Sequence, residues 1–325
     1  MSEYKGIKGF SIQSLSADPA DPNIGQVWYN SSSGSLKLTS ATTTGTWATG
    51  GNLATARYHM AGAGTQTEAL GAGGYDGVVK NLTEEYNGTS WSPSGSIATS
   101  RYTLAGAGTQ TAAVIFGGST PAFTGATEEY NGSTWSPSNS LNTARGSLAG
   151  AGTQTAALAF GGNVPGGKSA ATEEYDGNSW ATSPGSLNTA RSALGGGGLQ
   201  TAALGFGGSI SGVSQIITEE YDGSTWTSVN SLNTGRQDIR GGVTNPNSAV
   251  AFGGFSTAAT GATEEYDGTS WTNSTSMATA RLAPGGTGTQ AAALVFGGYT
   301  GTVYTNVTEE YTGSGALQTK TITVS

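Results

Sequence analysis

The chain has 325 residues, of which 54 are glycine and only 10% are charged, and its formal net charge is −8. A negative chain without a basic stripe argues against electrostatic capture of nucleic acid or of an anionic membrane. The sequence has no cysteine, which excludes disulfides and thiolate metal sites, and no apolar run approaches the length of a membrane-spanning helix.

The first segment in chain order is residues 1–44. Its start, MSEYKGIKGFSIQS, lacks the apolar core of a signal peptide, so we expect neither a secretion signal nor a membrane span. Farther along it contains Asp18-Pro19, then NIGQVWYN over 23–30 and GSLK over 34–37.

Residues 45–312 contain six copies of one unit of the form TAR…GTQT…FGG…ATEEYDGSTW. A fixed period in this range indicates a propeller, solenoid or array, because one unit cannot bury its apolar face without neighbours. The repeated arginines, spaced 44 to 46 residues apart, are Arg57, Arg101, Arg145, Arg191, Arg236 and Arg281.

Each unit is predicted to contain four short strands, a to d. In the third unit, strand a is the small-residue run 147–151 and strand b is the apolar run 156–160 before Gly-Gly; strand c carries Glu-Glu-Tyr, and strand d begins at Trp. Asn-Gly or Asp-Gly follows strand c in five units, which predicts a hairpin with a type I′ turn. Four antiparallel strands repeated around an axis make a β-propeller. The sequence therefore predicts an all-β, six-bladed propeller of four-stranded antiparallel blades.

The two ends of the repeat region are complementary. Trp47 stands ten residues before Arg57, as Trp91 does before Arg101, yet no Glu-Glu-Tyr precedes it; the last Glu-Glu-Tyr, at 309–311, has no Trp after it. The favoured prediction is that the Trp47 strand completes the last blade and joins the ends without an exposed edge. The alternative is that the alternating residues 316–324, within the C-terminal segment 313–325, form that outer strand.

The order of apolar run with Gly-Gly, Glu-Tyr and Trp is similar to the kelch repeat, and the resemblance covers all six units. Kelch propellers are mostly recognition scaffolds, and one branch is a copper-radical oxidase. That oxidase chemistry needs a cysteine cross-linked to tyrosine together with histidine ligands, whereas this chain has no cysteine and a single histidine.

The stretch 18–37 resembles the short GQ-W-Y-N…G-LK β-hairpin module of tailed-bacteriophage structural proteins. It also resembles the leader of kelch-like proteins in marine phage genomes. This resemblance implies a short N-terminal hairpin and a virion component, such as a fibre, appendage or decoration subunit. Local pairing in that family would place Leu36-Lys37-Leu38 against the Trp47 strand, in competition with the favoured closure.

The repeated polar and aromatic residues are interpreted as structural. Paired glutamates suit glycoside hydrolysis, but six equivalent pairs do not make one active site, and alternation along strand c sends the two glutamates to opposite faces. One glutamate per blade is expected to meet the arginine, which ties blade to blade; the other faces solvent or caps backbone donors. With the six arginines, the structural set comprises Glu85, Glu129, Glu174, Glu220, Glu265, Glu310, Trp47, Trp91, Trp135, Trp180, Trp226 and Trp271.

Three further motifs are expected to carry no chemistry. Residues 162–169, GNVPGGKS, satisfy the P-loop pattern, but a strand rather than a helix is predicted after Lys168. The stretch 222–226, DGSTW, is one residue too short for the Asp-box of sialidases. His59 is the only histidine, and Asp76, Asp176 and Asp238 are not spaced as calcium ligands. No catalytic residue, metal or cofactor is predicted.

The loops between strands b and c differ in every unit and share one face with the d–a loops. Binding residues often lie on loops that a rigid scaffold positions. The candidate binding residues on this face are Tyr75, Phe123, Phe255, Tyr299 and Tyr304, and neutral drift of solvent-facing loops is the competing interpretation.

The leading hypothesis is a non-enzymatic phage structural protein located in the virion, in which residues 1–44 contact other virion proteins and the propeller binds a host-surface glycan or protein. A secreted or surface lectin-like propeller is the alternative, and a sialidase-like glycosidase is a remote one. Neither nucleic acid nor a membrane is an expected partner, and the sequence leaves a homo-oligomer open.

Overall fold

The computed structural model describes residues 12–20, 23–41, 44–315 and 317–322, which form strands and loops with no helix. The prediction that the chain has no secretion signal rests largely on residues 1–11, and these lie outside the described residues. The chain divides into a unit of Thr46–Thr312 and a second unit that combines the residues before and after it. Among the described residues there is no helix long and apolar enough to cross a membrane.

The unit Thr46–Thr312 contains six four-stranded antiparallel sheets, which we number I to VI. The strands of each sheet are given from the innermost to the outermost. Sheet I is β5 (Ala61–Gly64), β6 (Ala69–Ala72), β7 (Thr83–Tyr86) and β8 (Trp91–Ser94); sheet II is β9 (Ala105–Gly108), β10 (Ala113–Phe116), β11 (Thr127–Tyr130) and β12 (Trp135–Ser138); sheet III is β13 (Ala149–Thr153), β14 (Ala156–Phe160), β17 (Thr172–Tyr175) and β18 (Trp180–Thr182). Sheet IV is β19 (Gly195–Leu199), β20 (Ala202–Phe206), β23 (Thr218–Tyr221) and β24 (Trp226–Val229); sheet V is β25 (Arg240–Asn245), β26 (Ser248–Phe252), β27 (Thr263–Tyr266) and β28 (Trp271–Ser274); sheet VI is β29 (Gly285–Gly288), β30 (Ala292–Phe296), β31 (Thr308–Thr312) and β4 (Thr46–Thr49). Two short hairpins, β15 (Asn163–Val164) with β16 (Gly167–Lys168) and β21 (Ser209–Ile210) with β22 (Val213–Ser214), lie in the b–c loops of sheets III and IV.

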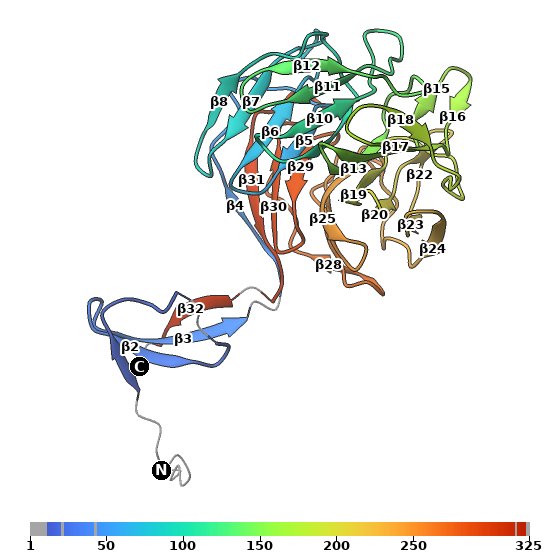
Figure 1. Cartoon of the computed structure of the whole chain (residues 1–325). Helices are drawn as coiled ribbons and strands as arrows, with labels where there is room; N and C mark the ends of the chain where they lie inside the picture. The colour runs from blue at the N-terminus through green and yellow to red at the C-terminus, as the bar shows by residue number, and fades with distance from the viewer. Residues whose placement is uncertain (1–11, 21–22, 42–43, 316, 323–325) are drawn as a thin grey trace. The chain divides into compact units, whose positions relative to one another are not determined.

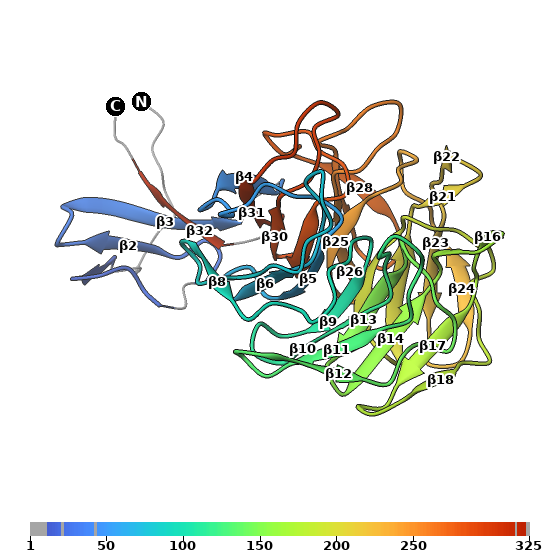
Figure 2. The same cartoon turned by 90° about the horizontal axis from the view of Figure 1, so that it is seen from above.

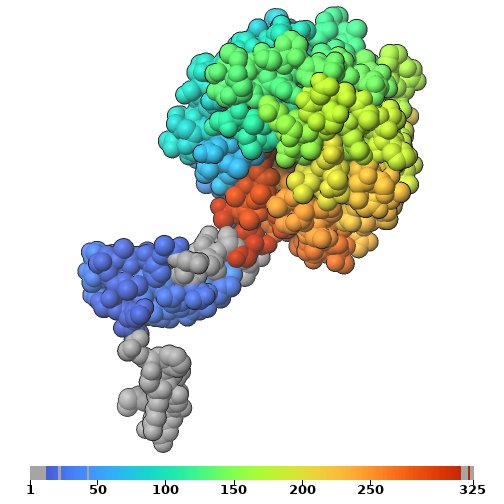
Figure 3. Space-filling view, in the orientation of Figure 1, coloured from blue at the N-terminus to red at the C-terminus, as the bar shows by residue number. Residues whose placement is uncertain are grey.

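The inner strands contact one another in cyclic order, from β5 through β9, β13, β19 and β25 to β29, which lies beside β5. Glycine and alanine permit this close approach: a Cβ on Gly62 would lie 2.5 Å from the backbone oxygen of Gly286. Figures 1 and 2 show the sheets following one another around the unit, and in Figure 3 the red residues of the last repeat lie next to the blue residues of the first. The fold is therefore all-β and propeller-like.

The last sheet takes its outer strand from the start of the repeat region. Strand β4 pairs antiparallel with β31, and Trp47 lies opposite Tyr311. The Trp47 indole Nε1 donates to Thr263 Oγ1 of sheet V over 3.1 Å. The favoured prediction of the closing strand is thus confirmed. The alternative is wrong, because β32 (Leu317–Thr321) pairs with β3 (Ser35–Ala41) in the other unit; residues 316, 323 and 324 of that predicted strand lie outside the described residues.

A ring of backbone hydrogen bonds links all six sheets. It is formed by the residue two places after each repeat arginine, where each N–H donates to the carbonyl of its counterpart in the preceding sheet over 2.8–2.9 Å. The six residues have φ between 45° and 56°, a region that residues other than glycine rarely adopt. They are His59, Thr103, Ser147, Ala193, Asp238 and Ala283.

The hairpin predicted after strand c is present, but its predicted turn type is wrong. Four residues rather than two separate β23 from β24, and only Gly223 among them has positive φ. The Asp222 carboxylate accepts hydrogen bonds from the N–H groups of Thr225 and Ser224 over 2.7 and 2.8 Å. These bonds lower the pKa of Asp222 below its ordinary value. The dipeptide therefore acts through an Asx turn that caps the loop.

The second unit is a four-stranded sheet with the order β1-β2-β3-β32, in which β1 is Gln13–Leu15 and β2 is Val27–Asn30. Trp28 is fully buried, and its indole Nε1 donates to Asp18 Oδ1, which also accepts from Asn30 Nδ2. The short hairpin that the resemblance over 18–37 implies is present as the β2–β3 pair. The expected pairing of Leu36-Lys37-Leu38 with the Trp47 strand is wrong, because β3 lies between β2 and β32.

Candidate functional site

The first glutamate of each Glu-Glu pair forms a buried ion pair with the repeat arginine, as expected. In sheet IV, Arg191 pairs with Glu219, and both side chains are fully buried. The arginine side chain also donates to the carbonyls of Gly207 and Gly205 in the same sheet. The expectation that the arginines tie blade to blade is wrong for the guanidinium, because its partners belong to one sheet. It is confirmed for the backbone, since the Arg191 carbonyl accepts from the Gly162 N–H of the preceding sheet over 2.9 Å. The other five pairs are Arg57–Glu84, Arg101–Glu128, Arg145–Glu173, Arg236–Glu264 and Arg281–Glu309.

The second glutamate of each pair connects neighbouring sheets. Glu174 accepts a hydrogen bond from the phenol of Tyr221 in the next sheet over 2.6 Å. The expectation that this glutamate faces solvent or caps backbone donors is wrong, because the buried tyrosine of strand c needs an acceptor for its hydroxyl. The same bond recurs at Glu85, Glu129, Glu220, Glu265 and Glu310.

The repeated tryptophans also hold adjacent sheets together. Trp226 Nε1 donates to Thr172 Oγ1 of the preceding sheet over 2.9 Å, and its ring packs against Phe160 with centroids 4.8 Å apart. Trp91, Trp135, Trp180 and Trp271 make the same hydrogen bond to a threonine of the preceding sheet. The apolar core accordingly lies in six clusters, most of which bring residues of neighbouring sheets together.

The P-loop-like stretch forms the β15–β16 hairpin and is followed by strand β17. The Lys168 ammonium donates to Asn163 Oδ1 over 2.7 Å and to Ser192 Oγ over 2.9 Å. These partners fold the lysine back onto its own loop and the adjacent one, and no helix N-terminus follows that would hold a phosphate.

The axial space between the inner strands is too small for an organic ligand. Two cavities of about 50 and 140 Å³ lie along it, lined mainly by glycine and alanine. These volumes hold a few water molecules. Arg240 lines the first cavity, and one of its guanidinium nitrogens donates to the carbonyl of Ile239. Within the described part of the chain, no group of three or more acidic or histidine side chains could hold a metal ion.

The face that carries the b–c and d–a loops, which we call the variable-loop face, differs strongly from sheet to sheet. Backbone bridges hold three loop positions together in each sheet: the residue after the repeat arginine, the residue after Gly-Gly, and a residue returning along the b–c loop. In order from sheet VI, these trios are Leu282, Tyr299 and Tyr304; Tyr58, Tyr75 and Val79; Tyr102, Ser119 and Phe123; Gly146, Asn163 and Lys168; Ser192, Ser209 and Ser214; and Gln237, Phe255 and Ala259. Sheets VI, I and II thus carry tyrosines where sheets III and IV carry small or polar residues.

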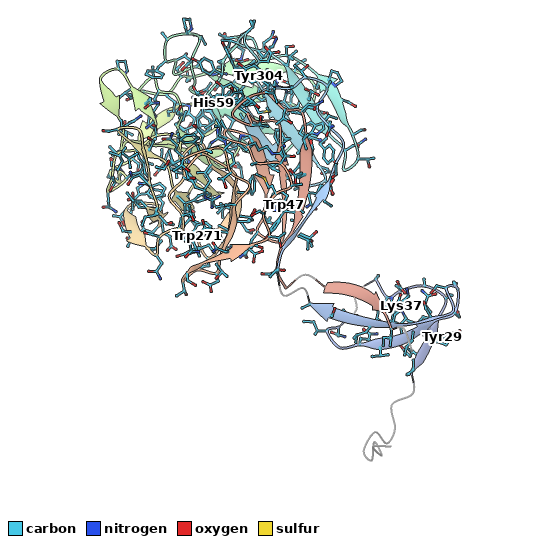
Figure 4. The ribbon with its side chains drawn as sticks, turned by 180° about the vertical axis from the view of Figure 1, so that it is seen from behind. Tyr29, Lys37, Trp47, His59, Trp271 and Tyr304 are labelled. Carbon is cyan, nitrogen blue, oxygen red and sulfur yellow. The ribbon has the colours of Figure 1, made fainter. Side chains whose placement is uncertain are left out.

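The five tyrosines of these trios and His59 form one cluster, which we call the tyrosine patch: Tyr58, Tyr75, Tyr102, Tyr299, Tyr304 and His59. Tyr58 is central, with its ring stacked on Tyr304 at a centroid distance of 5.4 Å and 5.7 Å from the Tyr299 ring. Tyr75 connects Tyr58, at 6.0 Å, with Tyr102, at 5.5 Å. In Figure 4, His59 and Tyr304 lie toward one end of the unit, away from Trp47 and Trp271.

The phenol hydroxyls of the patch differ from those of the repeat. The six tyrosines of strand c donate to glutamates. By contrast, the five patch phenols make no hydrogen bond to any residue that the structure describes, although every patch ring is half-buried. The patch therefore offers five hydroxyls and several ring faces to a ligand.

Tyr58 and His59 of the patch are both uncharged around physiological pH. Burial raises the pKa of Tyr58 above its ordinary value, with smaller contributions from Tyr304 and Tyr75. Burial also lowers the pKa of His59 to about 4, against the opposing effect of Asp238. Asp76, which lines the cleft beside Tyr299 and Tyr304, forms an ion pair with Lys80 over 2.9 Å.

An open cleft of about 620 Å³ adjoins the patch, lined by Tyr299, Tyr304, Thr302, Val303 and Asp76 together with residues 54–56. This volume lies within the range of small-molecule sites. A second cleft of similar size, lined by Tyr221, Asn245 and Asn247 among others, includes the a–b turn of sheet V. The first cleft is the better candidate because free aromatic groups converge on it.

Sequence reasoning found three members of the patch and missed three. Tyr75, Tyr299 and Tyr304 lie in it; Phe123 and Phe255 occupy matching loop positions but have no ring contact with it among the described residues. All five predicted aromatics are half-buried rather than fully exposed. Tyr58, Tyr102 and His59 were missed because they lie beside the repeat arginine rather than in the b–c loops. Aligning the residue after each arginine would have revealed the two tyrosines.

Comparison with known proteins finds neither a family model nor a curated protein that matches this chain.

Proposed function

We propose that the six sheets are the blades of a kelch-like six-bladed propeller, and that the chain is a non-enzymatic structural protein of a tailed-phage virion. The cyclic ring of backbone hydrogen bonds and the β4–β31 pair support the propeller. The GQ-W-Y-N…G-LK segment, folded around Trp28 and Asp18, supports the virion assignment through its resemblance to phage structural modules.

The proposed role is recognition of a host-surface glycan or protein by the variable-loop face. One observation carries this role: the tyrosine patch breaks the six-fold repeat on the one face whose loops vary. The repeat residues are occupied in holding the sheets, since the arginine pairs with one glutamate and the other glutamate accepts from tyrosine. The patch has no such internal role for its hydroxyls.

The second unit is proposed to bind other virion proteins. Its sheet includes β32, so the attachment unit comprises both residues 1–45 and residues 313–325. A deletion of residues 1–44 alone would leave β32 without its partner strand, and a cleaner truncation retains Thr46–Thr312.

The test compares the full chain with the truncation Thr46–Thr312 for incorporation into particles. Far-ultraviolet circular dichroism and thermal unfolding first establish that the truncated chain folds. We expect mass spectrometry of purified particles to detect the full chain and not the truncation. Incorporation of a folded truncation at the level of the full chain contradicts the attachment role.

A surface lectin-like propeller unconnected with a virion is the second candidate, and the tyrosine patch favours it equally. Glycan binding by the purified full chain, together with its absence from particles, selects this candidate. A glycosidase is disfavoured because each Glu-Glu pair is engaged by arginine and tyrosine. The glycosidase candidate would be restored if the chain hydrolysed a glycoside and a variant in one sheet, such as Glu129→Gln, no longer did.

A further inference from the structure

The surface chemistry of the tyrosine patch narrows the class of ligand. Sugar rings present C–H faces that pack against aromatic rings, as other apolar groups do in binding sites lined by tyrosine. The rings of Tyr58, Tyr75, Tyr299 and Tyr304 are half-buried, so each is fixed by its neighbours and still offers part of its surface. Tyrosine also loses little conformational entropy on binding, because it has only two side-chain torsions.

The free phenol hydroxyls add polar recognition. A hydroxyl both donates and accepts a hydrogen bond, so five unpaired phenols suit a ligand with many hydroxyls of its own. The adjoining cleft contributes Thr55, Thr302 and the Asp76 carboxylate beside Tyr299 and Tyr304. A carboxylate accepts two or more hydrogen bonds from neighbouring hydroxyls, and it is a poor neighbour for a second anion.

The charge of the site excludes an acidic ligand. None of the described residues that line the cleft is basic. The adjacent Lys80 is already paired with Asp76, and His59 is neutral above its lowered pKa. A sialylated, uronic or sulfated glycan would therefore meet Asp76 without a free counter-charge.

We infer that the tyrosine patch and the cleft beside Tyr299 and Tyr304 bind an uncharged oligosaccharide of hexose or N-acetylhexosamine units. This inference rests on the recognition role proposed above and assigns its ligand class. The small and polar loop residues of sheets III and IV, on the same face, take no part in the binding.

The test uses the purified full chain on an array that carries neutral hexose and N-acetylhexosamine oligomers beside sialic-acid and uronic-acid oligomers, followed by titration calorimetry with the best neutral oligomer. Tyr304→Ala and Tyr58→Ala should weaken binding about tenfold or more, because each removes a ring from the platform. Tyr304→Phe keeps the ring and removes one hydroxyl, so it should cause a smaller loss. Phe255→Ala and Lys168→Ala are matched controls at equivalent loop positions outside the patch and should bind as the unmodified chain does.

Two solution conditions sharpen the result. Because no free charge pair contributes, Kd in 0.05 M and 0.5 M NaCl should agree within about twofold. Between about pH 5.5 and 9 the affinity should also be flat, since the pKa of His59 is about 4 and the Tyr58 pKa is raised above its ordinary value.

The inference is overturned if the chain binds only acidic oligomers, binds no neutral oligomer, or binds with an affinity that depends on salt. It is also overturned if Tyr304→Ala and Tyr304→Phe both bind as tightly as the unmodified chain. The inference is also overturned if Tyr304→Ala stops binding a protein partner and still binds the saccharide. Particle incorporation is scored separately: normal incorporation of Tyr304→Ala without saccharide binding by the unmodified chain defeats the ligand assignment and leaves the virion role standing.

Discussion

At the scale of single residues, the repeat positions are buried charges and phenols whose partners lie at fixed places. The Arg191 guanidinium and the Glu219 carboxylate are both fully buried, and Glu219 also accepts from the N–H of Asn188 over 2.6 Å. A buried ion pair contributes modestly to stability while intact, but removing one partner leaves a charge that water cannot solvate. The six identical pairs are therefore sensitive to single substitutions.

Arg191→Met should lower the free energy of unfolding by about 3–5 kcal/mol, because the Glu219 carboxylate remains buried without its counter-ion. The matched control is Arg240→Met, which removes an arginine that forms no ion pair among the described residues. The control should lower the free energy of unfolding less than Arg191→Met does, because no buried carboxylate loses its counter-ion. Urea unfolding followed by tryptophan fluorescence measures both, and equal losses in the two variants would show that the ion pair has no special weight.

At the scale of elements, the closing sheet is the one place where strands distant in sequence complete a repeat. Strand β4 precedes the first repeat, yet it pairs with β31 as β8 pairs with β7. Trp47 packs on Tyr311 with ring centroids 4.8 Å apart and on Phe252 at 5.4 Å. Without β4 the outer side of β31 would lose its hydrogen-bonding partner.

A circular permutant tests this element. The new chain begins at Asn52, runs to Tyr311, continues through an Asp-Gly-Ser-Thr turn into Trp47, and ends at Gly51. Because the turn reproduces those of the other sheets, the permutant should fold with a Tm close to that of the chain Thr46–Thr312. Deleting residues 46–49 instead should lower Tm and promote aggregation, as measured by calorimetry and light scattering. A permutant that does not fold would contradict the equivalence of β4 with the other outer strands.

At the scale of the whole molecule, six tyrosine–glutamate bonds encircle the unit, one between each pair of neighbouring sheets. Burial, together with the hydrogen bond to glutamate, raises the pKa of Tyr130, Tyr175 and Tyr221 to about 12 from an ordinary value of 10.0. The same causes raise the pKa of Tyr86, Tyr266 and Tyr311.

Stability should consequently fall at alkaline pH. Below pH 10 the phenols are neutral in both states; between about pH 10 and 12 the unfolded chain loses their protons first, which favours unfolding. The free energy of unfolding, from urea titrations at pH 9, 10 and 11, should decline with a steep slope because six groups act together. Tyr175→Phe should reduce that slope and cost about 1–3 kcal/mol at pH 8, where Glu129 loses a donor. An unchanged free energy between pH 9 and 11 would contradict the coupling.

Much of the fold was predictable because the residue pattern within each repeat indicates its strands and turns. Apolar runs before Gly-Gly became the buried second strands, and Asn-Gly or Asp-Gly became hairpins. The turn type was predicted wrongly because Asp222 caps the loop through its side chain, a contact that a dipeptide pattern does not reveal. The partner of β32 was likewise hidden, since a short alternating strand pairs with whichever edge lies nearest in space.

The sequence by itself determined the period, the number of repeats and the complementarity of Trp47 with the last Glu-Glu-Tyr, because these depend on residue order alone. Only the tertiary structure decided which glutamate meets arginine and which meets the next sheet's tyrosine. Arg191 and Glu219 are 28 residues apart in sequence and Tyr221 and Glu174 are 47 apart, so the chain must fold before these side chains can meet. The tertiary structure also decided the tyrosine patch. Tyr58 and Tyr304 lie at opposite ends of the repeat region in sequence, and they stack because the last sheet lies beside the first.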